Sequence, residues 1–329
     1  MTISEETLFL LKLSKIKGVG PAKLKKIAAL PDFSSLSLEH WGESLLSQAS
    51  TVSIRELLDK AEDAAEFDLR EAIRFDCSIL SQLDSEFPPL LKKTPDCPFF
   101  LYVRGQLRPE SGKSIAIIGT REPTEHGKEI TKRIAELFSE MQWSIVSGLA
   151  LGCDSIAHMS ALESYGHTVA VLAHGLQTVA PKQHARLAEK ILDRGGALVS
   201  EYGFGVEPSR FFFVKRDRIQ AGLAQGVVMI QSDEEGGSLH ASRAAIEYGR
   251  TLAVPYPTKR DIVEKATKIN ANLILSSEDE ERKVQLLKCA PADLDNLVIV
   301  RSKEDYPYLM QSLESSLSLD ISLLRHAEM

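Results

Sequence analysis

Short apolar runs alternate with segments of helical spacing from about residue 114 onward. Each run is apolar at consecutive positions, which is typical of strands buried on both faces of a parallel sheet. The runs predict strands at 115–118, 144–146, 168–172, 197–200, 227–230 and 252–254. The gaps between them predict helices at 125–141, 154–165, 183–194, 216–225 and 239–249. This alternation predicts an α/β fold with an extended Rossmann-like, doubly wound and mostly parallel sheet.

The beginning of the chain follows a different pattern. Apolar residues recur at helical spacing from Thr7 to about Leu58, and residues 59–75 are typical of a charged helix. We therefore expect a small helical domain at 1–75, followed by the Rossmann-like domain at 76–290. For residues 291–329 we expect a short C-terminal segment with one strand and one helix and no winged-helix pattern.

Composition and charge narrow the class of protein. The chain has 329 residues, of which 43% are hydrophobic, and a formal net charge of -7. No opening signal segment is visible, nor any run near the roughly 18 to 20 apolar residues that cross a bilayer, so we expect a cytoplasmic protein without a membrane partner. The four cysteines lack a C-x-x-C pair and the first strand is not followed by G-x-G-x-x-G, so we expect no metal and no cofactor.

A glycine-rich turn near the start of the chain, "KIKGVGPAKLKKIAAL", separates two predicted helices. Gly18 and Gly20 permit positive backbone dihedrals, and Pro21 suits the first turn of the next helix. Exposed N–H groups at that helix start, followed by Lys23, suit a phosphate, as in a helix-hairpin-helix. The alternative is an ordinary helical hairpin with a solvated lysine face.

The loops that leave the strands carry the candidate binding residues, because ligands of such sheets collect at the carboxyl ends of the strands. After the first strand, Gly119 and Thr120 lead to Arg121, whose guanidinium can grip a phosphate. After the second, Ser147 and Gly148 allow an anion to approach the backbone. We interpret Asp154, which follows them, as the cap of the next helix.

Two later segments add charge and aromatic side chains. Gly237 and Ser238 open a helix as a possible anion cradle, beside the acidic run 233–235. In "EPSRFFFVKRDRIQAG" three phenylalanines alternate with cations, a pattern typical of single-stranded nucleic acid binding. The candidates in this stretch are Arg210, Phe213, Lys215, Arg216 and Arg218. The alternative places at least one of the phenylalanines in the core.

Several of these segments, in this order, resemble the DNA-processing protein A (DprA/Smf) family: "IAIIGTREPTEHG", "IVSGLALGCDSIAH", "GLQTVAPKQHARLAEKILDRGGALVSEY", "FFFVKRDRIQAGLAQGVVMIQ" and "GGSLHASRAAIEYGRTLAVP". The resemblance implies a non-enzymatic protein that binds single-stranded DNA without sequence preference. It also implies a homodimer that loads a RecA-type recombinase onto DNA in natural transformation. By position it places Arg121 on phosphate, Lys182 and Arg210 in a basic pocket, and Arg216 and Arg218 at R-N-R-like positions.

The chain departs from the family pattern at some of these positions. Asp217 stands where the family has Asn, which suggests that it holds the neighbouring arginines structurally. An alternative function is a small-nucleotide site in which Arg121 and residues 236–238 bind one phosphate while Asp233 or Glu235 assists removal of a base from a nucleoside monophosphate. A third is an interaction scaffold whose pocket is vestigial.

Overall fold

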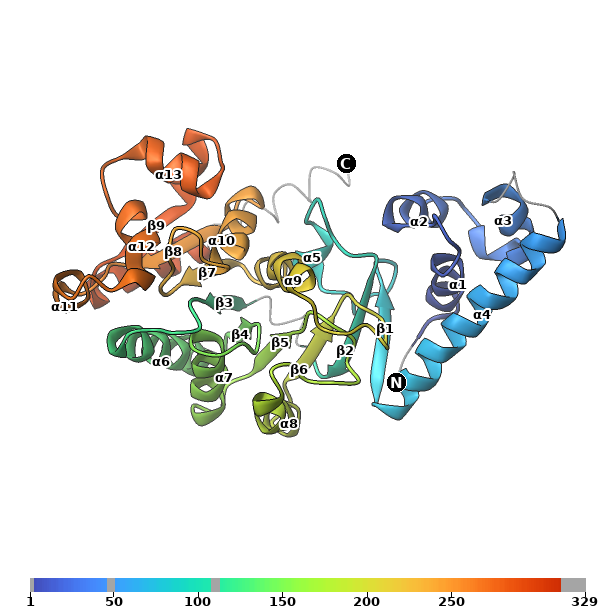
Figure 1. The fold of residues 1–329 in the computed structure, drawn as a ribbon, viewed down its shortest axis with the longest axis horizontal. Coiled ribbons are helices and arrows are strands. Elements are labelled where there is room, and N and C mark those ends of the chain that lie inside the picture. The colour runs from blue at the N-terminus through green and yellow to red at the C-terminus, as the bar shows by residue number, and fades with distance from the viewer. Residues whose placement is uncertain (1–2, 46–50, 108–112, 315–329) are drawn as a thin grey trace.

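Nine strands form one central sheet in the order β1-β2-β6-β5-β4-β3-β7-β8-β9 (Figure 1). The computed structural model describes residues 3–45, 51–107 and 113–314, with the side chains of 51–53 left out. The strands are β1 (Cys77–Ser81), β2 (Phe100–Gly105), β3 (Ser114–Ile118), β4 (Ser144–Ser147), β5 (Thr168–Val171), β6 (Ala197–Ser200), β7 (Gly226–Met229), β8 (Thr251–Pro255) and β9 (Leu297–Val300).

The strands from β6 across to β9 are all parallel, whereas β2 pairs antiparallel with β6 and β1 antiparallel with β2. The central strands β4 to β8 are buried at every position, as consecutive apolar runs require. The predicted Rossmann-like, mostly parallel sheet is therefore confirmed. The antiparallel edge formed by β1 and β2 was not predicted.

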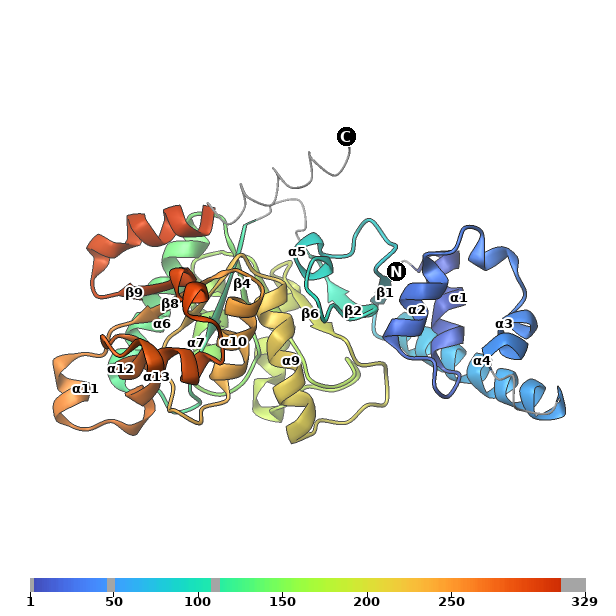
Figure 2. The same ribbon diagram turned by 90° about the horizontal axis from the view of Figure 1, so that it is seen from above.

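Helices cover both faces of the sheet (Figures 1 and 2). One face carries α6 (Glu125–Glu140), α7 (Cys153–Glu163) and α8 (Ala185–Asp193). The other carries α5 (Pro89–Lys92), α9 (Arg210–Gly222), α10 (Ser238–Glu247), α12 (Asn270–Leu275) and α13 (Glu280–Leu287), and the short α11 (Lys259–Val263) follows β8. The two faces enclose separate apolar clusters, so the sheet is a fully covered middle layer.

The N-terminal helices lie against the β1 edge of the sheet (Figure 1). They are α1 (Glu5–Ser14), α2 (Pro21–Ala28), α3 (Leu38–Leu45) and α4 (Thr51–Arg74). Phe99 belongs to their apolar cluster, while Leu11 belongs to a cluster of the sheet domain. The Thr7 hydroxyl also contacts Ser81 Oγ and Asp84 Oδ2, each at 2.6 Å. The helical region and the sheet domain therefore share buried surface.

One expectation about an element boundary needs correction. The helix expected at 216–225 begins six residues earlier, at Arg210, because Ser209 Oγ accepts a hydrogen bond from Phe212 N at 3.2 Å and caps it.

The beginning of the C-terminal segment expected at 291–329 contains a strand and a helix, as predicted. The strand β9 pairs with β8 in the main sheet, and a helix over 306–314 follows. Part of this segment, residues 315–329, lies outside the described residues, so the expectation of no winged helix stays a prediction.

Arg250 fixes the far end of α9. It is buried, and its Nη1 donates to the carbonyl oxygens of Ala221, Gly222 (2.8 Å) and Ala224, which end the helix. Its Nη2 donates to Leu90 O at 2.6 Å. A cation at a helix C-terminus satisfies carbonyl groups that have no partner within the helix. Arg250 thus holds in place the helix that carries much of the candidate site.

We expect Arg250→Ala to lower the free energy of unfolding by about 3 kcal/mol, because it leaves several buried carbonyl groups without a donor. Urea unfolding followed by circular dichroism measures the loss. Arg133→Ala is the matched control, since Arg133 lies exposed on α6 and pairs with Glu129 across one helical turn. Such surface pairs contribute about 0.3–0.5 kcal/mol. Equal losses in the two variants would contradict the anchoring role of Arg250.

Candidate nucleic-acid interface

A cluster of exposed cations lies at the carboxyl edge of the sheet, where the β3–α6 loop meets the start of α9. Arg121, on that loop, places its guanidinium carbon 5.9 Å from the centre of the Phe213 ring. Arg210 precedes Phe213 by three residues on α9 and so projects from the same side of the helix. Both arginines are exposed and form no ion pair with any residue in the described ranges. The structure therefore brings these three predicted residues together.

Lys182 also lies beyond the carboxyl end of a parallel strand, in the connection between β5 and α8. It is the first residue of a 3-10 helix, Lys182–His184. His184 Nδ1 lies 2.7 Å from Leu149 O, which fastens the connection to the β4–α7 loop. Lys182 is exposed there. We call the exposed cations Arg121, Lys182, Arg210 and Lys215, together with the half-buried Phe213, the rim.

Lys215 places the rim next to a second aromatic ring. Its Nζ lies 4.5 Å from the centre of the Phe211 ring, one helical turn earlier on α9. Phe211 is 60% exposed, unusual for a large apolar side chain, and it packs beside Phe212. Alternating cations and exposed rings can neutralise phosphates and stack on bases.

Arg216, a candidate DNA-binding residue in the sequence, faces the interior instead of the rim. It is 4% exposed, and its Nη1 donates to Gly148 O at 2.7 Å and to Val171 O. Its Nε lies 3.1 Å from Asp217 Oδ1. The guanidinium is thus used to fasten α9 to the ends of β4 and β5. The interpretation of Asp217 as a structural partner agrees with this geometry.

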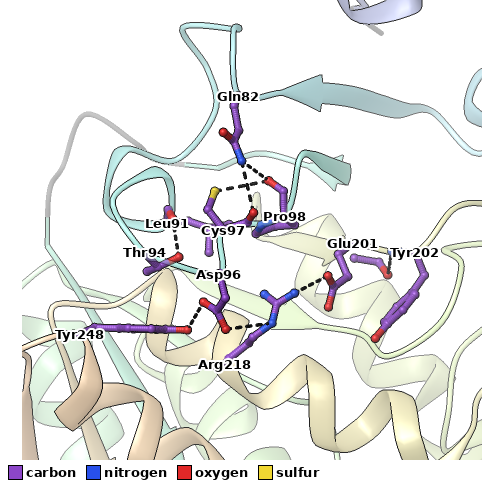
Figure 3. Close-up of polar contacts among 11 residues, drawn as sticks. Gln82, Leu91, Thr94, Asp96, Cys97, Pro98, Glu201, Tyr202, Arg218 and Tyr248 are labelled. Atoms are coloured by element: carbon purple, nitrogen blue, oxygen red, sulfur yellow. Dashed lines mark hydrogen bonds and ion pairs between the residues drawn. The ribbon is translucent and has the colours of Figure 1, made fainter. Parts of the chain in front are cut away.

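Arg218 is likewise held by carboxylates, on the other side of α9. Its Nη2 donates to Glu201 Oε2 at 2.5 Å and its Nε lies 3.3 Å from Asp96 Oδ2 (Figure 3). Tyr248 OH donates to the same Asp96. Arg218 is therefore 21% exposed and paired, and it lines a groove next to the rim.

The small residues after β3 and β4 are required by packing, not by the approach of an anion. Ser147 is fully buried and its Oγ donates to Ile117 O at 2.6 Å. A Cβ on Gly148 would stand 2.2 Å from Arg216 Nη1, and one on Gly119 2.5 Å from Cys153 Sγ. The backbone at Gly119 and Gly148 is therefore not open to an anion, contrary to the expectation from the sequence.

Gln231, which follows β7, closes the crevice between the two halves of the sheet. The Thr120 amide donates to Gln231 O at 2.8 Å. The Gln231 side chain accepts from Thr124 N at 3.0 Å and donates to Thr124 Oγ1 at 2.8 Å. The sequence analysis did not single out Gln231. The sequence feature that could have identified Gln231 is its position as a polar residue directly after a predicted buried strand.

The loop before α10 bonds within itself and to α12 and α13. Ser238 Oγ donates to Ser232 Oγ at 2.8 Å, and a Cβ on Gly236 would stand 2.2 Å from that same hydroxyl. Asn270 Nδ2 donates to Asp233 Oδ1 at 3.4 Å. Gly237 is exposed. Among the described residues no hydrogen bond or ion pair joins Gly237 or Ser238 to Arg121, so these groups do not share one phosphate site in this structure.

The N-terminal turn has the shape expected of a helical hairpin. Gly18 has a positive φ of +87°, whereas Gly20 has an extended φ of -102° and precedes Pro21 at the start of α2. Val19 between the glycines is buried, which holds the turn against the helical core. Lys23 is exposed on α2. Both glycines permit a positive φ, but Gly20 does not adopt one, because it serves as the N-cap of α2.

A buried acidic pair surrounds Arg216. Asp154 accepts from Gly148 N at 3.1 Å and from Ala150 N at 3.3 Å, so it braces the β4–α7 loop, while Gly152 is the actual cap of α7. Burial raises the pKa of Asp154. Burial also raises the pKa of Asp217 to about 7, although the nearby Arg216 opposes the shift.

The described residues include no group of three or more His, Cys, Asp or Glu side chains placed to hold a metal ion. None of the helices in these ranges has the length and apolar content needed to span a bilayer.

The geometry defines a Rossmann-like α/β protein with an exposed basic and aromatic edge. The model of the DNA recombination-mediator protein A family matches residues 78–280. The chain belongs to this family, as its sequence motifs predict.

Relatives and solved structures agree with this assignment. Protein Smf of Escherichia coli is 41% identical over 176 residues, which are 53% of this chain and 47% of that protein. Protein Smf of Synechocystis is 32% identical over 271 residues, 79% of this chain and 67% of that protein. The match thus spans about half the length of the Escherichia coli relative.

Two solved structures are similar. DNA processing protein A from Streptococcus pneumoniae has a TM-score of 0.63 at 26% identity, over 84% of this chain and 99% of that one. DNA processing protein A from Helicobacter pylori, described for its unique single-stranded DNA binding mode, has a TM-score of 0.51 at 26% identity. That likeness covers 66% of this chain and 98% of the other.

The raised pKa of Asp217 predicts a pH dependence of stability. The pKa of an aspartate in an unfolded chain is about 4. Between about pH 4 and 7 the folded state therefore holds a proton that the unfolded state has lost, and the free energy of unfolding falls as the pH rises. Asp217→Asn removes this titration. We expect its advantage over the parent protein to grow by roughly 2 kcal/mol from pH 5 to pH 8.

Urea unfolding of both proteins at the two pH values measures this difference. Asp193→Asn on the exposed end of α8 is the control and should show no such growth. An advantage of Asp217→Asn that stays constant across the pH range would refute the prediction.

Proposed function

We propose that the protein is a non-catalytic, sequence-independent binder of single-stranded DNA, and that the rim is its main contact surface. The observation that carries the proposal is the position of the Arg121 guanidinium over the Phe213 ring, which lies about one helical turn from Arg210 on α9. Exposed guanidinium groups can neutralise phosphates, and rings beside them can stack on bases whatever their sequence. Membership of the DNA recombination-mediator protein A family supports this class of ligand.

The Helicobacter pylori relative, described for single-stranded DNA binding, adds support from a protein whose fold this chain shares. The family also supports a role in DNA processing, uptake and recombination in the cytoplasm. On the same ground we propose that the protein acts as a homodimer and passes its strand to a RecA-type recombinase in natural transformation. The exposed turn at Gly18 and Lys23 is proposed as an additional phosphate contact.

Hydrolysis of a nucleoside monophosphate is a less favoured function. It needs a phosphate held jointly by Arg121 and residues 236–238, next to a carboxylate. Gln231 instead ties the β3 and β7 loops directly to one another, and Ser238 bonds to Ser232. The acidic loop therefore lies beside a crevice that protein groups already fill.

We expect Arg121→Ala together with Arg210→Ala to weaken binding of a single-stranded oligonucleotide by about 3 kcal/mol or more. Charge-assisted hydrogen bonds contribute about 1.5–3 kcal/mol each. Fluorescence anisotropy at several salt concentrations measures both the affinity and its salt dependence. The slope of log affinity against log salt should become shallower by about 0.7 for each lost phosphate contact.

Lys132→Ala together with Arg133→Ala is the matched control, because it removes two exposed cations of α6 that pair with acidic neighbours. This control should leave affinity nearly unchanged. An unchanged isotherm for the Arg121 and Arg210 variant, or preference of the parent protein for duplex DNA, would place the site elsewhere.

A further inference from the structure

A groove lies between the helical region and the sheet domain, next to α9. It consists of two hollows of about 640 and 410 Å³. Both are lined by Pro21, Asp96, Glu201 and Arg218, so they are continuous. We call them together the junction groove. Each volume is within the range of about 300–1,000 Å³ found for ligand sites.

Cations and aromatic rings line this groove from both regions of the chain. Lys25 reaches it from α2, and Lys215 from α9. Phe100 lies in one hollow, and Tyr202 and Tyr248 in the other. Lys25 and Lys215 are exposed and form no ion pair with any residue in the described ranges. The groove therefore has the same two kinds of side chain as the rim.

Asp96 and Glu201 on the groove wall are engaged by protein groups, whereas Glu247, which also lines the groove, is exposed. Arg218 lies between Asp96 and Glu201, and Tyr248 donates to Asp96 (Figure 3). Burial raises the pKa of Glu201. The third guanidinium nitrogen of Arg218, Nη1, is buried and has no hydrogen-bond partner among the described residues.

The groove continues the rim along α9. Lys215 belongs to both surfaces, and Arg218 follows it by three residues, a rise of about 5 Å along the helix. Phe211, with its ring beneath Lys215, is the exposed aromatic side chain at the start of this path. A flexible polyanion bound at the rim thus meets the groove without leaving the surface of α9.

We propose that the junction groove is the second half of the single-strand site. The strand leaves the rim over Phe211 and Lys215 and enters the groove between α9 and α2, where Lys25 contacts its backbone. This inference rests on the proposed function of the rim. It assigns the helical region a contact through Lys25, which lines the groove.

Asp68 acts as the positioning residue of the groove. It is buried on α4, and it accepts from Lys15 Nζ, from Tyr102 OH at 2.8 Å and from Phe204 N at 3.0 Å. Lys15 caps α1 just before the glycine turn, and Phe204 lies in the loop that leads to α9. One carboxylate therefore sets the distance between the two walls.

The test compares oligothymidylates of increasing length in binding titrations at fixed low salt. For the parent protein we expect tight binding of short strands, followed by a second gain in affinity once the strand is long enough to reach the groove. Lys25→Ala should weaken binding of long strands by about 5- to 20-fold and leave short strands unaffected. Lys303→Ala, an exposed lysine beyond the opposite edge strand β9, is the matched control and should change neither.

The outcomes separate the two proposals. Failure of short strands to bind the parent protein would overturn the function of the rim. Short-strand binding without a length-dependent gain, or an equal effect of Lys25→Ala on all lengths, would overturn the groove alone. A further outcome would also overturn the inference: an acidic peptide competes for the groove, Lys25→Ala abolishes that competition, and Lys25→Ala does not change the binding of long strands. The groove would then be a protein-binding site.

For Asp68→Asn we expect the length-dependent gain to shrink by at least about threefold while short-strand affinity is kept. The amide still accepts from Phe204 N but loses the charge pair with Lys15. Circular dichroism and urea unfolding verify that the variant is folded. A merely structural role would lower the affinity for all lengths in proportion to the unfolded fraction, and that result would refute the positioning role.

Discussion

The candidate interface depends on one buried cation. Arg216 reaches from α9 to Gly148 O and Val171 O at the ends of β4 and β5, and Asp217 balances its charge. A guanidinium suits this role because its several donors lie in one plane and stay charged when buried. Any side chain at position 148 would collide with it, so the glycine follows from the arginine. Because this contact fixes α9 over the sheet, it also sets where the exposed cations project.

The sequence "RFFFVKRDR" shows how helical geometry separates neighbouring residues into different roles. Arg216 lies on the buried side, and Arg218 lies two residues later on a side that meets Asp96 and Glu201. Lys215 stands on the exposed side above Phe211. Successive residues turn by about 100° around a helix, so a run of like charges need not form one patch. Composition alone cannot make this distinction.

The sequence was sufficient for the parallel part of the sheet and for the family, because buried parallel strands have a clear apolar signature and the motifs occur in order. It was insufficient where tertiary contacts decide. Ser209 caps α9, which begins six residues before the expected start, and the phenylalanine run concealed this boundary. Gly119 and Gly148 suggested anion access, but Cys153 and Arg216 fill the space beside them. Such neighbours are distant in sequence, so no local pattern reveals them.

A net charge of -7 is compatible with a polyanionic ligand, because Asp96 and Glu201 beside the proposed path are paired with Arg218. Exposed charges act over a screening length of about 8 Å at physiological salt, so the local arrangement of charges outweighs the net charge.

The apolar core shared by the helical region and the sheet domain also favours binding. Since Leu11 and Phe99 pack across the boundary and Asp68 bonds to both sides, the helical region is not a flexible tether. A DNA strand that spans both regions therefore meets contact residues whose relative positions are already fixed. Little conformational entropy of the protein is lost when it binds.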